Sequence, residues 1–219
     1  MIVYATHKGG RYLPIEESLA EQPEGKRNIY VNLTNKCNCA CTFCLRNMKE
    51  MAEEHSLWLK SEPTVDEVKN ELNALPWDKI AEVVFCGFGE PTLRLPALVE
   101  LLHFVKENYP EHPTRVNTNG LSELQHGHET ASAFRGILDT VSISLNASSA
   151  EKYYELTRAK YGLESYEGML TFAEHCKEYV PNVVLTIVDH VTSDEDIEKC
   201  RKICESRGLT LRVRPYENS

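Results

Sequence analysis

Short runs rich in β-branched residues recur along the chain, and each is long enough for one strand of a sheet. Within most of these runs apolar and polar residues alternate with the period of two that is typical of a β-strand. The pattern predicts six strands: Asn28–Thr34, Glu82–Cys86, Thr114–Asn119, Thr140–Leu145, Val183–Asp189 and Thr210–Arg214.

Longer amphipathic stretches separate these runs and repeat with helical periodicity. Thr64 precedes Glu67 and Ser193 precedes Asp196 at N-cap spacing, and Gly208 follows the last stretch, where a helix commonly ends. Because strands and helices alternate, we expect an α/β fold with a parallel sheet. The predicted helices are Leu45–Lys60, Thr64–Leu75, Leu95–Asn108, Glu129–Arg135, Ala150–Leu156, Tyr166–Tyr179 and Ser193–Arg207.

The two faces of the predicted strands differ in polarity. On the fourth strand, Val141, Ile143 and Leu145 share one face, and Ser142 and Ser144 share the other. A parallel sheet covered by helices on both faces would have continuously apolar strands instead. We therefore expect an open or partial barrel with helices outside and a polar interior that receives a ligand. An antiparallel sheet with one wet face is the alternative, which the intervening helices disfavour.

Composition limits the classes of protein that the chain can belong to. Its 219 residues, 42% of them hydrophobic, suffice for one domain, and we expect a lead-in segment over 1–27 and the domain over 28–219. A formal charge of −9 disfavours nucleic acid and anionic lipid as partners. No apolar run approaches the roughly 18–20 residues of a membrane span, and no signal-like segment follows the first residues. We therefore expect a cytoplasmic protein without membrane contact.

Four of the eight cysteines, Cys37, Cys39, Cys41 and Cys44, lie within eight residues. A reducing compartment has little use for disulfides, and so tight a cluster does not easily meet disulfide geometry. Metal ligation is the better interpretation. Four thiolates could enclose a zinc ion in a non-catalytic interaction module. Alternatively, Cys37, Cys41 and Cys44 could hold three irons of a [4Fe-4S] cluster and leave the fourth iron open.

The spacing Cys37-x3-Cys41-x2-Cys44, with Phe43 before the last cysteine, resembles the signature of the radical SAM superfamily. The motif follows the first predicted strand, and active sites of αβ barrels assemble at that end of the strands. The resemblance spans roughly residues 28–214 and implies a partial (β/α)6 TIM-like barrel. The stretches Tyr30–Cys37 and Gly87–Arg94 look most like the small TatD-linked radical SAM proteins.

The resemblance implies an enzyme, an oxidoreductase that binds S-adenosylmethionine (SAM) on the open iron of a [4Fe-4S] cluster. Reductive cleavage of SAM then yields methionine and a 5′-deoxyadenosyl radical, which takes a hydrogen atom from an unidentified substrate. Cys37, Cys41 and Cys44 become the catalytic residues and iron ligands, Phe43 joins the cofactor-binding residues, and Cys39 is an extra thiol. The implied electron donor is a low-potential protein of the flavodoxin or ferredoxin type.

The segment Cys86–Thr92 resembles the family's Gly-Gly-Glu-Pro-like loop, which binds the methionyl amine, but here it is Gly-Phe-Gly-Glu-Pro. The resemblance assigns SAM binding to Gly87, Phe88, Gly89 and Glu90. Glycines let the backbone approach a ligand closely, and Glu90 can accept from an ammonium group. Taken alone, the segment is a Gly-Pro turn before a helix.

Further candidates for SAM binding lie at or beyond strand ends. Asn117 and Asn119 share a face of the third strand, and they are either ligand contacts or turn-forming residues. Ser144 and Asn146 end the fourth strand, and the resemblance implies that they reach the ribose and carboxylate of SAM. The last two candidates are Arg158, which suits a carboxylate anchor or a plain surface position, and Val188, which packs on adenine or in the core.

The sequence leaves the substrate open. A role like that of glycyl-radical activases and a role like that of carboxy-deazaguanine synthase are alternatives, and the zinc module is a third from another class. Arg212 and Arg214, on the polar face of the last strand, could bind an anionic substrate group or pair with acidic residues. The short chain carries no C-terminal cap, which favours a protein or other large substrate over the barrel opening.

Overall fold

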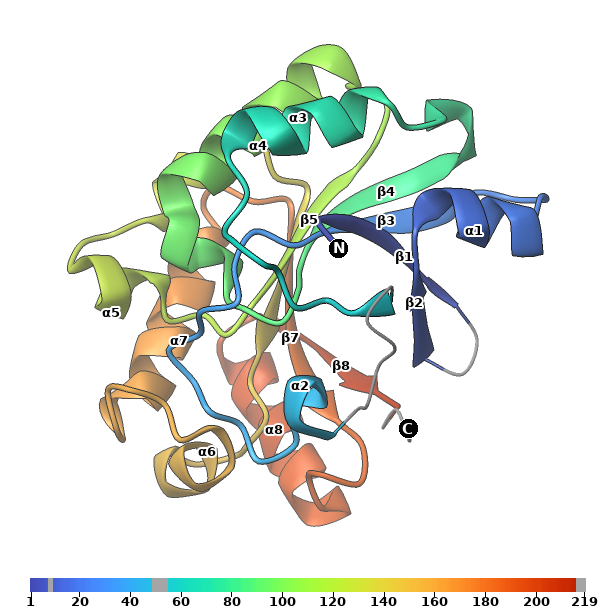
Figure 1. The fold of residues 1–219 in the computed structure, drawn as a ribbon. Helices are drawn as coiled ribbons and strands as arrows, with labels where there is room; N and C mark the ends of the chain where they lie inside the picture. The colour runs from blue at the N-terminus through green and yellow to red at the C-terminus, as the bar shows by residue number, and fades with distance from the viewer. Residues whose placement is uncertain (8–9, 49–54, 216–219) are drawn as a thin grey trace.

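The computed structural model describes residues 1–7, 10–48 and 55–215. One sheet of eight strands, in the order β2-β1-β3-β4-β5-β6-β7-β8, forms its centre (Figure 1). All neighbouring pairs from β3 to β8 are parallel, which confirms the predicted α/β sheet. The six predicted strands correspond to β3 (Arg27–Val31), β4 (Ile80–Phe85), β5 (Thr114–Thr118), β6 (Thr140–Ser144), β7 (Asn182–Val188) and β8 (Thr210–Arg214).

Five predicted helices are present, and the predicted caps are found on two of them, α3 and α8. The Thr64 hydroxyl accepts from the Glu67 backbone while the Glu67 carboxylate accepts from the Thr64 backbone, forming a capping box. The Ser193 hydroxyl accepts from the Asp196 backbone, and Gly208 adopts φ +62° after the last helix. These helices are α3 (Val65–Asn73), α4 (Leu95–Asn108), α6 (Ala150–Thr157), α7 (Glu164–Cys176) and α8 (Asp194–Ser206).

The predicted helix Leu45–Lys60 is wrong at its C-terminal end. Helix α2 covers Leu45–Met48, residues 49–54 lie outside the described residues, and residues 56–60 are not helical. Asn32 Nδ2 donates to the Leu57 carbonyl at 2.7 Å, and Asn35 exchanges two hydrogen bonds with the Leu59 backbone. These long-range bonds satisfy backbone groups that a helix would pair internally, and they override the local periodicity.

The prediction of a helix over Glu129–Arg135 is also wrong, because only a 3-10 turn, η5 (Ala131–Phe134), forms there. The five-residue helix α5 (Ser122–His126) was not predicted, since so short a helix has little periodicity. Two further 3-10 turns are η3 (Trp77–Lys79) and η4 (Pro91–Arg94).

Three elements lie within the segment 1–27 that was expected to be a lead-in. Strand β1 (Val3–His7) pairs antiparallel with both β3 and β2 (Arg11–Leu13), and α1 (Ile15–Glu21) packs beside β1. The domain boundary between residues 27 and 28 stays a prediction, but β1 and β2 hydrogen-bond into the same sheet as the rest of the chain. Strand β2 has only three residues, too few for alternation to mark it, and β1 was not recognised as a strand.

The polarity of the two sheet faces matches the prediction. Ile29, Val31, Val141 and Ile143 are fully buried in the core that lies between the sheet and the helices outside it (Figure 1). Ser142 and Ser144 point to the opposite, interior face and are partly exposed. The strand order runs from β2 to β8 without closing, so the described residues form a partial barrel.

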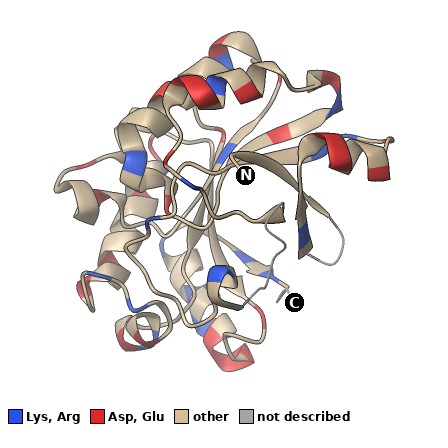
Figure 2. Cartoon of the chain, in the orientation of Figure 1, with Lys and Arg blue, Asp and Glu red and all other residues tan. Residues whose placement is uncertain are grey.

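Charge is unevenly distributed over the fold. Acidic residues concentrate on the helices, for example in the first turns of α1, α3 and α8, whereas β8 carries basic residues (Figure 2). Among the described helices, none combines the length and the apolar character that a bilayer crossing requires.

Candidate active site

The four clustered cysteines lie on one loop, residues 36–44, which we call the cysteine loop. It follows the C-terminal end of β3 and is fixed against the end of α6. Ala40 N donates to the Thr157 carbonyl at 2.8 Å, and Thr42 N donates to the Leu156 carbonyl at 2.9 Å. The last turn of α6 thus uses carbonyls that have no partner within the helix to hold this loop.

The cysteines differ in where they point. All four are free thiols, and Cys39 is buried at 5% exposure in the main core, whereas Cys37, Cys41 and Cys44 are partly exposed. The Cys39 thiol lies within hydrogen-bonding reach of the Cys37 and Cys41 sulfurs. The three residues of the family motif are therefore the accessible ones, and Cys39 turns into the protein.

Two of the accessible thiols are biased toward the thiolate form that metals bind. The hydrogen bond from Cys39 lowers the pKa of Cys37 and of Cys41, and the charge of Arg46 acts in the same direction. Burial is the main influence on Cys44 and raises its pKa. The loop therefore stabilises negative charge on Cys37 and Cys41 before any metal is bound.

The spacing of the sulfurs separates the two kinds of metal site. A tetrahedral zinc site with Zn–S bonds of about 2.3 Å holds its sulfurs roughly 4 Å apart. Within the described residues, no three cysteine sulfurs lie within 4.8 Å of one another. A [4Fe-4S] cluster places each thiolate on a different iron and so needs wider separation. The described residues of the cysteine loop therefore form no preassembled tetrahedral zinc site.

The two glycines after β4 allow a close approach between loops of the chain itself. A Cβ on Gly89 would stand 2.1 Å from the Thr34 carbonyl oxygen and 2.6 Å from that of Lys36. A Cβ on Gly87 would stand 2.1 Å from Asn32 Oδ1. Both positions are therefore restricted to glycine by the chain that leads into the cysteine loop, whatever they contribute to a ligand.

The Phe88 side chain points into a cluster of aromatic and apolar residues on the interior side of β1, β2 and β3. This aromatic cluster consists of Tyr4, Tyr12, Leu57 and Phe88, with Tyr30 packed against it. Trp58 packs edge-on against Phe88 at 5.2 Å between ring centroids and is 50% exposed. The phenylalanine in the Gly-Phe-Gly-Glu-Pro segment therefore anchors the loop in this cluster.

Glu90 is almost fully buried, at 4% exposure, and ties three segments together. Its Oε1 accepts from the Thr118 hydroxyl at 2.7 Å and from the Thr92 hydroxyl at 2.8 Å, and its Oε2 accepts from Asn119 N at 2.8 Å. Its own backbone N donates to the Lys36 carbonyl. Burial raises the pKa of Glu90, and these donors act in the opposite direction.

Asn119 and Asn117 lie on the same side of β5 and reach different neighbours. Asn119 Nδ2 donates to Asn38 Oδ1 at 2.6 Å and lies 3.8 Å from Cys37 Sγ and 3.6 Å from Cys39 Sγ. Asn117 faces the interior beside Cys86, and its buried Oδ1 has no hydrogen-bond partner among the described residues. The structure thus brings Asn119 to the cysteine loop and leaves Asn117 an open acceptor.

Ser144, Asn146 and Val188 line the same interior face. Ser144 is in register with Thr186, and Val188 is in register with Arg214. Asn146 is buried and adopts φ +58°, a conformation that turns the chain directly after β6. Its polar side chain therefore stands at the carboxyl edge of the sheet.

The remaining predicted residues, Arg158 and Phe43, flank the cysteine loop. Arg158 is exposed and adopts φ +47° as it ends α6, directly after the two carbonyls that hold the loop. Phe43 is part of the loop itself and is partly exposed. Every predicted site residue therefore lies at or near one edge of the sheet.

Two charged residues on the interior face, Glu82 and Arg115, were not predicted, and they lie beside the predicted Arg212. Glu82 forms an ion pair with Arg115 at 2.8 Å and accepts from Asn28 Nδ2 at 2.8 Å. Burial raises the pKa of Glu82, while the charges of Arg115 and then Arg212 lower it. Arg212 and Arg214 are exposed and form no ion pair with another described residue. The alternation of Arg115 with Asn117 could have revealed this group.

Tyr153 is a second residue that the sequence did not single out. It lies in α6 with 0% exposure, and its hydroxyl has no partner among the described residues. A tyrosine on the buried face of a helix carries no sequence signal that separates it from ordinary core.

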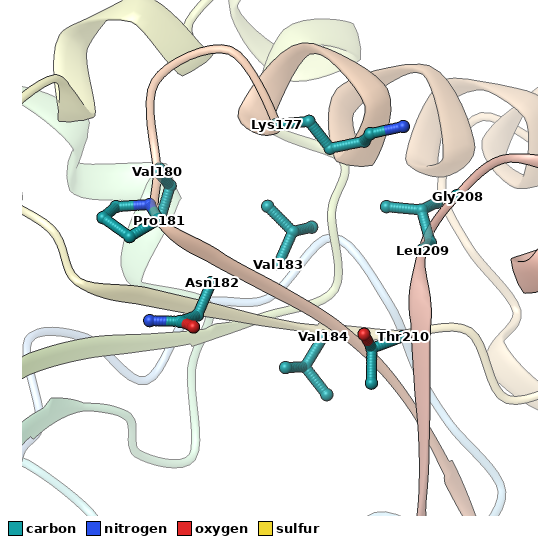
Figure 3. A pocket seen from close by; sticks show the side chains of 9 residues that line it. All are labelled: Lys177, Val180, Pro181, Asn182, Val183, Val184, Gly208, Leu209 and Thr210. Atoms are coloured by element: carbon teal, nitrogen blue, oxygen red, sulfur yellow. The ribbon is translucent and has the colours of Figure 1, made fainter.

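A separate cavity of about 440 Å³ lies at the opposite edge, between the beginnings of β7 and β8 (Figure 3). Lys177 Nζ donates there to the Arg207 carbonyl at 2.7 Å and so satisfies the end of α8. None of the predicted site residues lines this cavity. Its lining residues are Lys177, Val180, Pro181, Asn182, Val183, Val184, Gly208, Leu209 and Thr210.

The family model of the Radical SAM superfamily matches residues 31–204, which include the cysteine loop and all strands from β4 to β7. The chain belongs to the radical SAM superfamily. Enzymes of this superfamily use a [4Fe-4S] cluster together with SAM. The expected family, fold and cofactors are thereby confirmed, whereas the likeness to TatD-linked members stays a prediction.

Relatives within the superfamily have different activities. A Methanocaldococcus jannaschii protein named as an activating enzyme for glycyl-radical enzymes is 29% identical over 79% of this chain and 67% of its own length. GTP 3′,8-cyclase of Streptomyces coelicolor is 32% identical over 67% of this chain and 41% of the cyclase. This chain therefore spans two thirds of the first of these relatives and two fifths of the second.

Solved radical SAM structures share the fold at low identity. A radical SAM methyltransferase from Sphaerobacter thermophilus matches with a TM-score of 0.62 at 14% identity, covering 97% of this chain and 72% of the methyltransferase. Streptococcus suis SuiB, solved with bound SAM, matches with a TM-score of 0.63 at 18% identity, covering 91% of this chain and 42% of SuiB. These similarities support the radical SAM barrel and no particular substrate.

Polar atoms without partners show that the edge suits a radical SAM cofactor set. Asn32 Oδ1, Asn38 Nδ2 and Asn117 Oδ1 are buried and have no hydrogen-bond partner among the described residues. Buried polar groups in folded proteins are rarely left unpaired. SAM offers amino, carboxylate and hydroxyl groups to such atoms, and the three accessible thiols offer ligands for iron. The residues present therefore fit both groups.

Proposed function

We propose that this radical SAM enzyme holds its [4Fe-4S] cluster on Cys37, Cys41 and Cys44, cleaves SAM reductively and abstracts a hydrogen atom from its substrate. The observation that supports this most is the orientation of the cysteine loop. The three motif cysteines are accessible at the carboxyl edge, and Cys39 is buried as their hydrogen-bond partner. A four-cysteine zinc module would need all four sulfurs around one ion, and nothing among the described residues supports that alternative.

Different residues of the chain bind the cluster and fix the arrangement of the two loops. Cys37, Cys41 and Cys44 supply thiolates, and Arg46 balances part of their negative charge. Gly89 and Glu90 fix the distance between the two loops. When bound, the cluster supplies one electron to SAM, and breakage of the S–C5′ bond gives methionine and a 5′-deoxyadenosyl radical.

SAM lies, in this proposal, along the carboxyl edge from the cysteine loop to β7. The acceptor Asn117 Oδ1 and the partly exposed Ser144 face that path, as do Asn146, Val188 and Thr186 on the neighbouring strands. Gly87, Phe88, Gly89 and Glu90 contribute backbone groups and one carboxylate oxygen with spare acceptor capacity. Arg158, Phe43 and Asn119 border the cysteine loop and complete the proposed set.

We further propose a low-potential flavodoxin or ferredoxin as electron donor and the cytoplasm as location. Three partly exposed cysteines give such a donor a short path to the cluster. Low-potential Fe–S chemistry also suits a reducing compartment.

The substrate is proposed to carry a negative charge. Arg212 and Arg214 stand on the interior face without an ion-pair partner among the described residues, in a chain whose net charge is −9. Guanidinium groups suit carboxylate or phosphate. The relatives include one named for activating proteins and one named for converting a nucleotide, so a protein and a small molecule are both candidates. Deuterium transfer from labelled candidates into 5′-deoxyadenosine distinguishes them.

Cysteine variants test the proposed ligand set. After anaerobic reconstitution, we expect reduced wild-type protein to form 5′-deoxyadenosine from SAM, and Cys41→Ala to lose at least ~99% of this activity because one iron loses its ligand. Cys39→Ala is the matched control and should keep most of the activity. Chromatography of the products measures all three proteins. Normal product formation by Cys41→Ala would show that the ligand assignment is wrong.

A further inference from the structure

Tyr153 lies on α6, the helix whose last turn holds the cysteine loop. Thr157, one turn further along the same face, accepts a hydrogen bond from Ala40 of the loop through its carbonyl. The Thr157 hydroxyl donates back to the Tyr153 carbonyl at 2.7 Å, which fixes this turn. Tyr153 and Cys39 belong to the same buried core. The tyrosine therefore lies in the core shared by α6 and Cys39, one turn before the carbonyl that binds the loop.

The hydroxyl of Tyr153 is buried and has no hydrogen-bond partner among the described residues. Such a group is expensive to leave unpaired in a fully buried position. Burial raises the pKa of Tyr153 well above its ordinary value, and the negative charges of Cys39, Cys41, Glu90 and Cys37 raise it further. The phenol thus stays protonated, is within the range at which these charges act on it, and is available as a donor.

The side chain of Asn119 already places a donor near two sulfurs of the loop. Asn119 Nδ2 lies 3.6 Å from Cys39 Sγ and 3.8 Å from Cys37 Sγ, although its shortest hydrogen bond goes to Asn38. Hydrogen bonds to the sulfurs are one of the means by which a protein sets the potential of an Fe–S cluster. Reduction adds negative charge to the cluster, so each donor stabilises the reduced form more than the oxidised form.

We propose that the Tyr153 hydroxyl donates a hydrogen bond to a sulfur of the cluster site and raises the reduction potential of the bound cluster. This inference rests on the proposed function, because it requires a cluster on the cysteine loop. Tyr153 acts here as a positioning residue: it does not ligate iron and it contacts neither SAM nor substrate.

Tyr166 provides a matched control within the same structure. It packs edge-on against Tyr153 at 5.7 Å between ring centroids, it is buried at 9% exposure, and its hydroxyl also has no partner among the described residues. Its charged neighbours are Cys200, Arg207, Cys204 and Glu167, not the cysteine loop. Tyr166→Phe therefore removes the same atom from the same environment of packed helices without touching the cluster site.

The test compares reconstituted wild type, Tyr153→Phe and Tyr166→Phe. Iron per chain is determined first, and an anaerobic redox titration followed by EPR then gives the reduction potential. Because EPR detects only chains with a reduced cluster, the potential is defined even where loading is incomplete. We expect Tyr153→Phe to shift the potential to more negative values and to alter the EPR line shape, while Tyr166→Phe matches wild type.

Two results would overturn the inference. Equal potentials in all three proteins, or an equal shift in both variants, would show that the Tyr153 hydroxyl does not act on the cluster, and the proposed function would stand. Absence of iron from the wild type would instead overturn the proposed function and this inference together.

Discussion

At the scale of single residues, Gly89 sets the distance between the loop after β4 and the cysteine loop. Its φ is not in the left-handed region, so the backbone itself would accept alanine. The obstacle is steric, because the added Cβ would meet two backbone carbonyl oxygens at 2.1 and 2.6 Å. Backbone cannot rotate away as a flexible side chain can, so the cysteine loop itself would have to move.

We therefore expect Gly89→Ala to lower the free energy of unfolding by about 2–3 kcal/mol and to reduce iron uptake more than twofold. Urea unfolding and iron per chain measure the two effects. Gly136→Ala is the control: Gly136 has φ +74° and open space around its Cα, so its substitution costs about 1 kcal/mol and leaves iron uptake intact. Unchanged iron uptake in Gly89→Ala would contradict this account of the loop contact.

The chemistry of individual residues was predictable where spacing or alternation marked it. Cys37, Cys41 and Cys44 follow from their spacing, and Asn119 follows from its place at a strand end. The burial of Cys39 and the position of Tyr153 could not be predicted, because both depend on how α6 packs against the cysteine loop. That packing joins residues more than 100 positions apart in the chain.

At the scale of elements, Asp196 connects α8 to α6. Its carboxylate accepts from Lys152 Nζ at 2.7 Å, from the Ser148 hydroxyl at 2.7 Å and from the Ser193 hydroxyl at 3.1 Å. The pKa of Asp196 is lowered from 3.8 to about 2, and the hydrogen bond from Lys152 is the largest cause. The ionised form is therefore favoured in the folded protein.

Because the folded pKa is lower than the unfolded one, this contribution to stability is present above pH 3.8 and is lost as the pH falls toward 2. We expect Asp196→Asn to lower the free energy of unfolding by about 1 kcal/mol at pH 7, since Lys152 is half exposed. The difference from wild type should shrink below pH 3.8. Urea titrations at several pH values measure it, with the exposed Asp194→Asn as control. A difference independent of pH would contradict the assignment.

Local pattern predicted elements well where it agreed with tertiary contacts. The capped helices α3 and α8 and the six parallel strands are examples. The segment 45–60 has helical periodicity, but the side chains of Asn32 and Asn35 bind the backbone of Leu57 and Leu59, which are not helical. Strands β1 and β2 were missed because pairing with a neighbouring strand, and no pattern of their own, defines them: β1 pairs with β3, and β2 pairs with β1.

At the scale of the whole molecule, an open barrel with polar atoms along one edge and accessible cysteines beside it accounts for the radical SAM assignment. The same barrel explains why strands were apolar on one face only. The sequence could not indicate how charge is arranged inside the barrel. Glu82 forms an ion pair with Arg115, whereas Arg212 and Arg214 have no ion-pair partner among the described residues. That arrangement results from strand register, which the sequence alone did not define.

The central claim is that three cysteines hold a [4Fe-4S] cluster with one iron open to SAM. Iron and sulfide analysis of the anaerobically reconstituted protein, combined with EPR of the reduced cluster before and after addition of SAM, tests it most directly. The account predicts about four irons per chain and an EPR spectrum that changes when SAM is added. A colourless protein with one tightly bound zinc, or a cluster whose spectrum is unaffected by SAM, would contradict it.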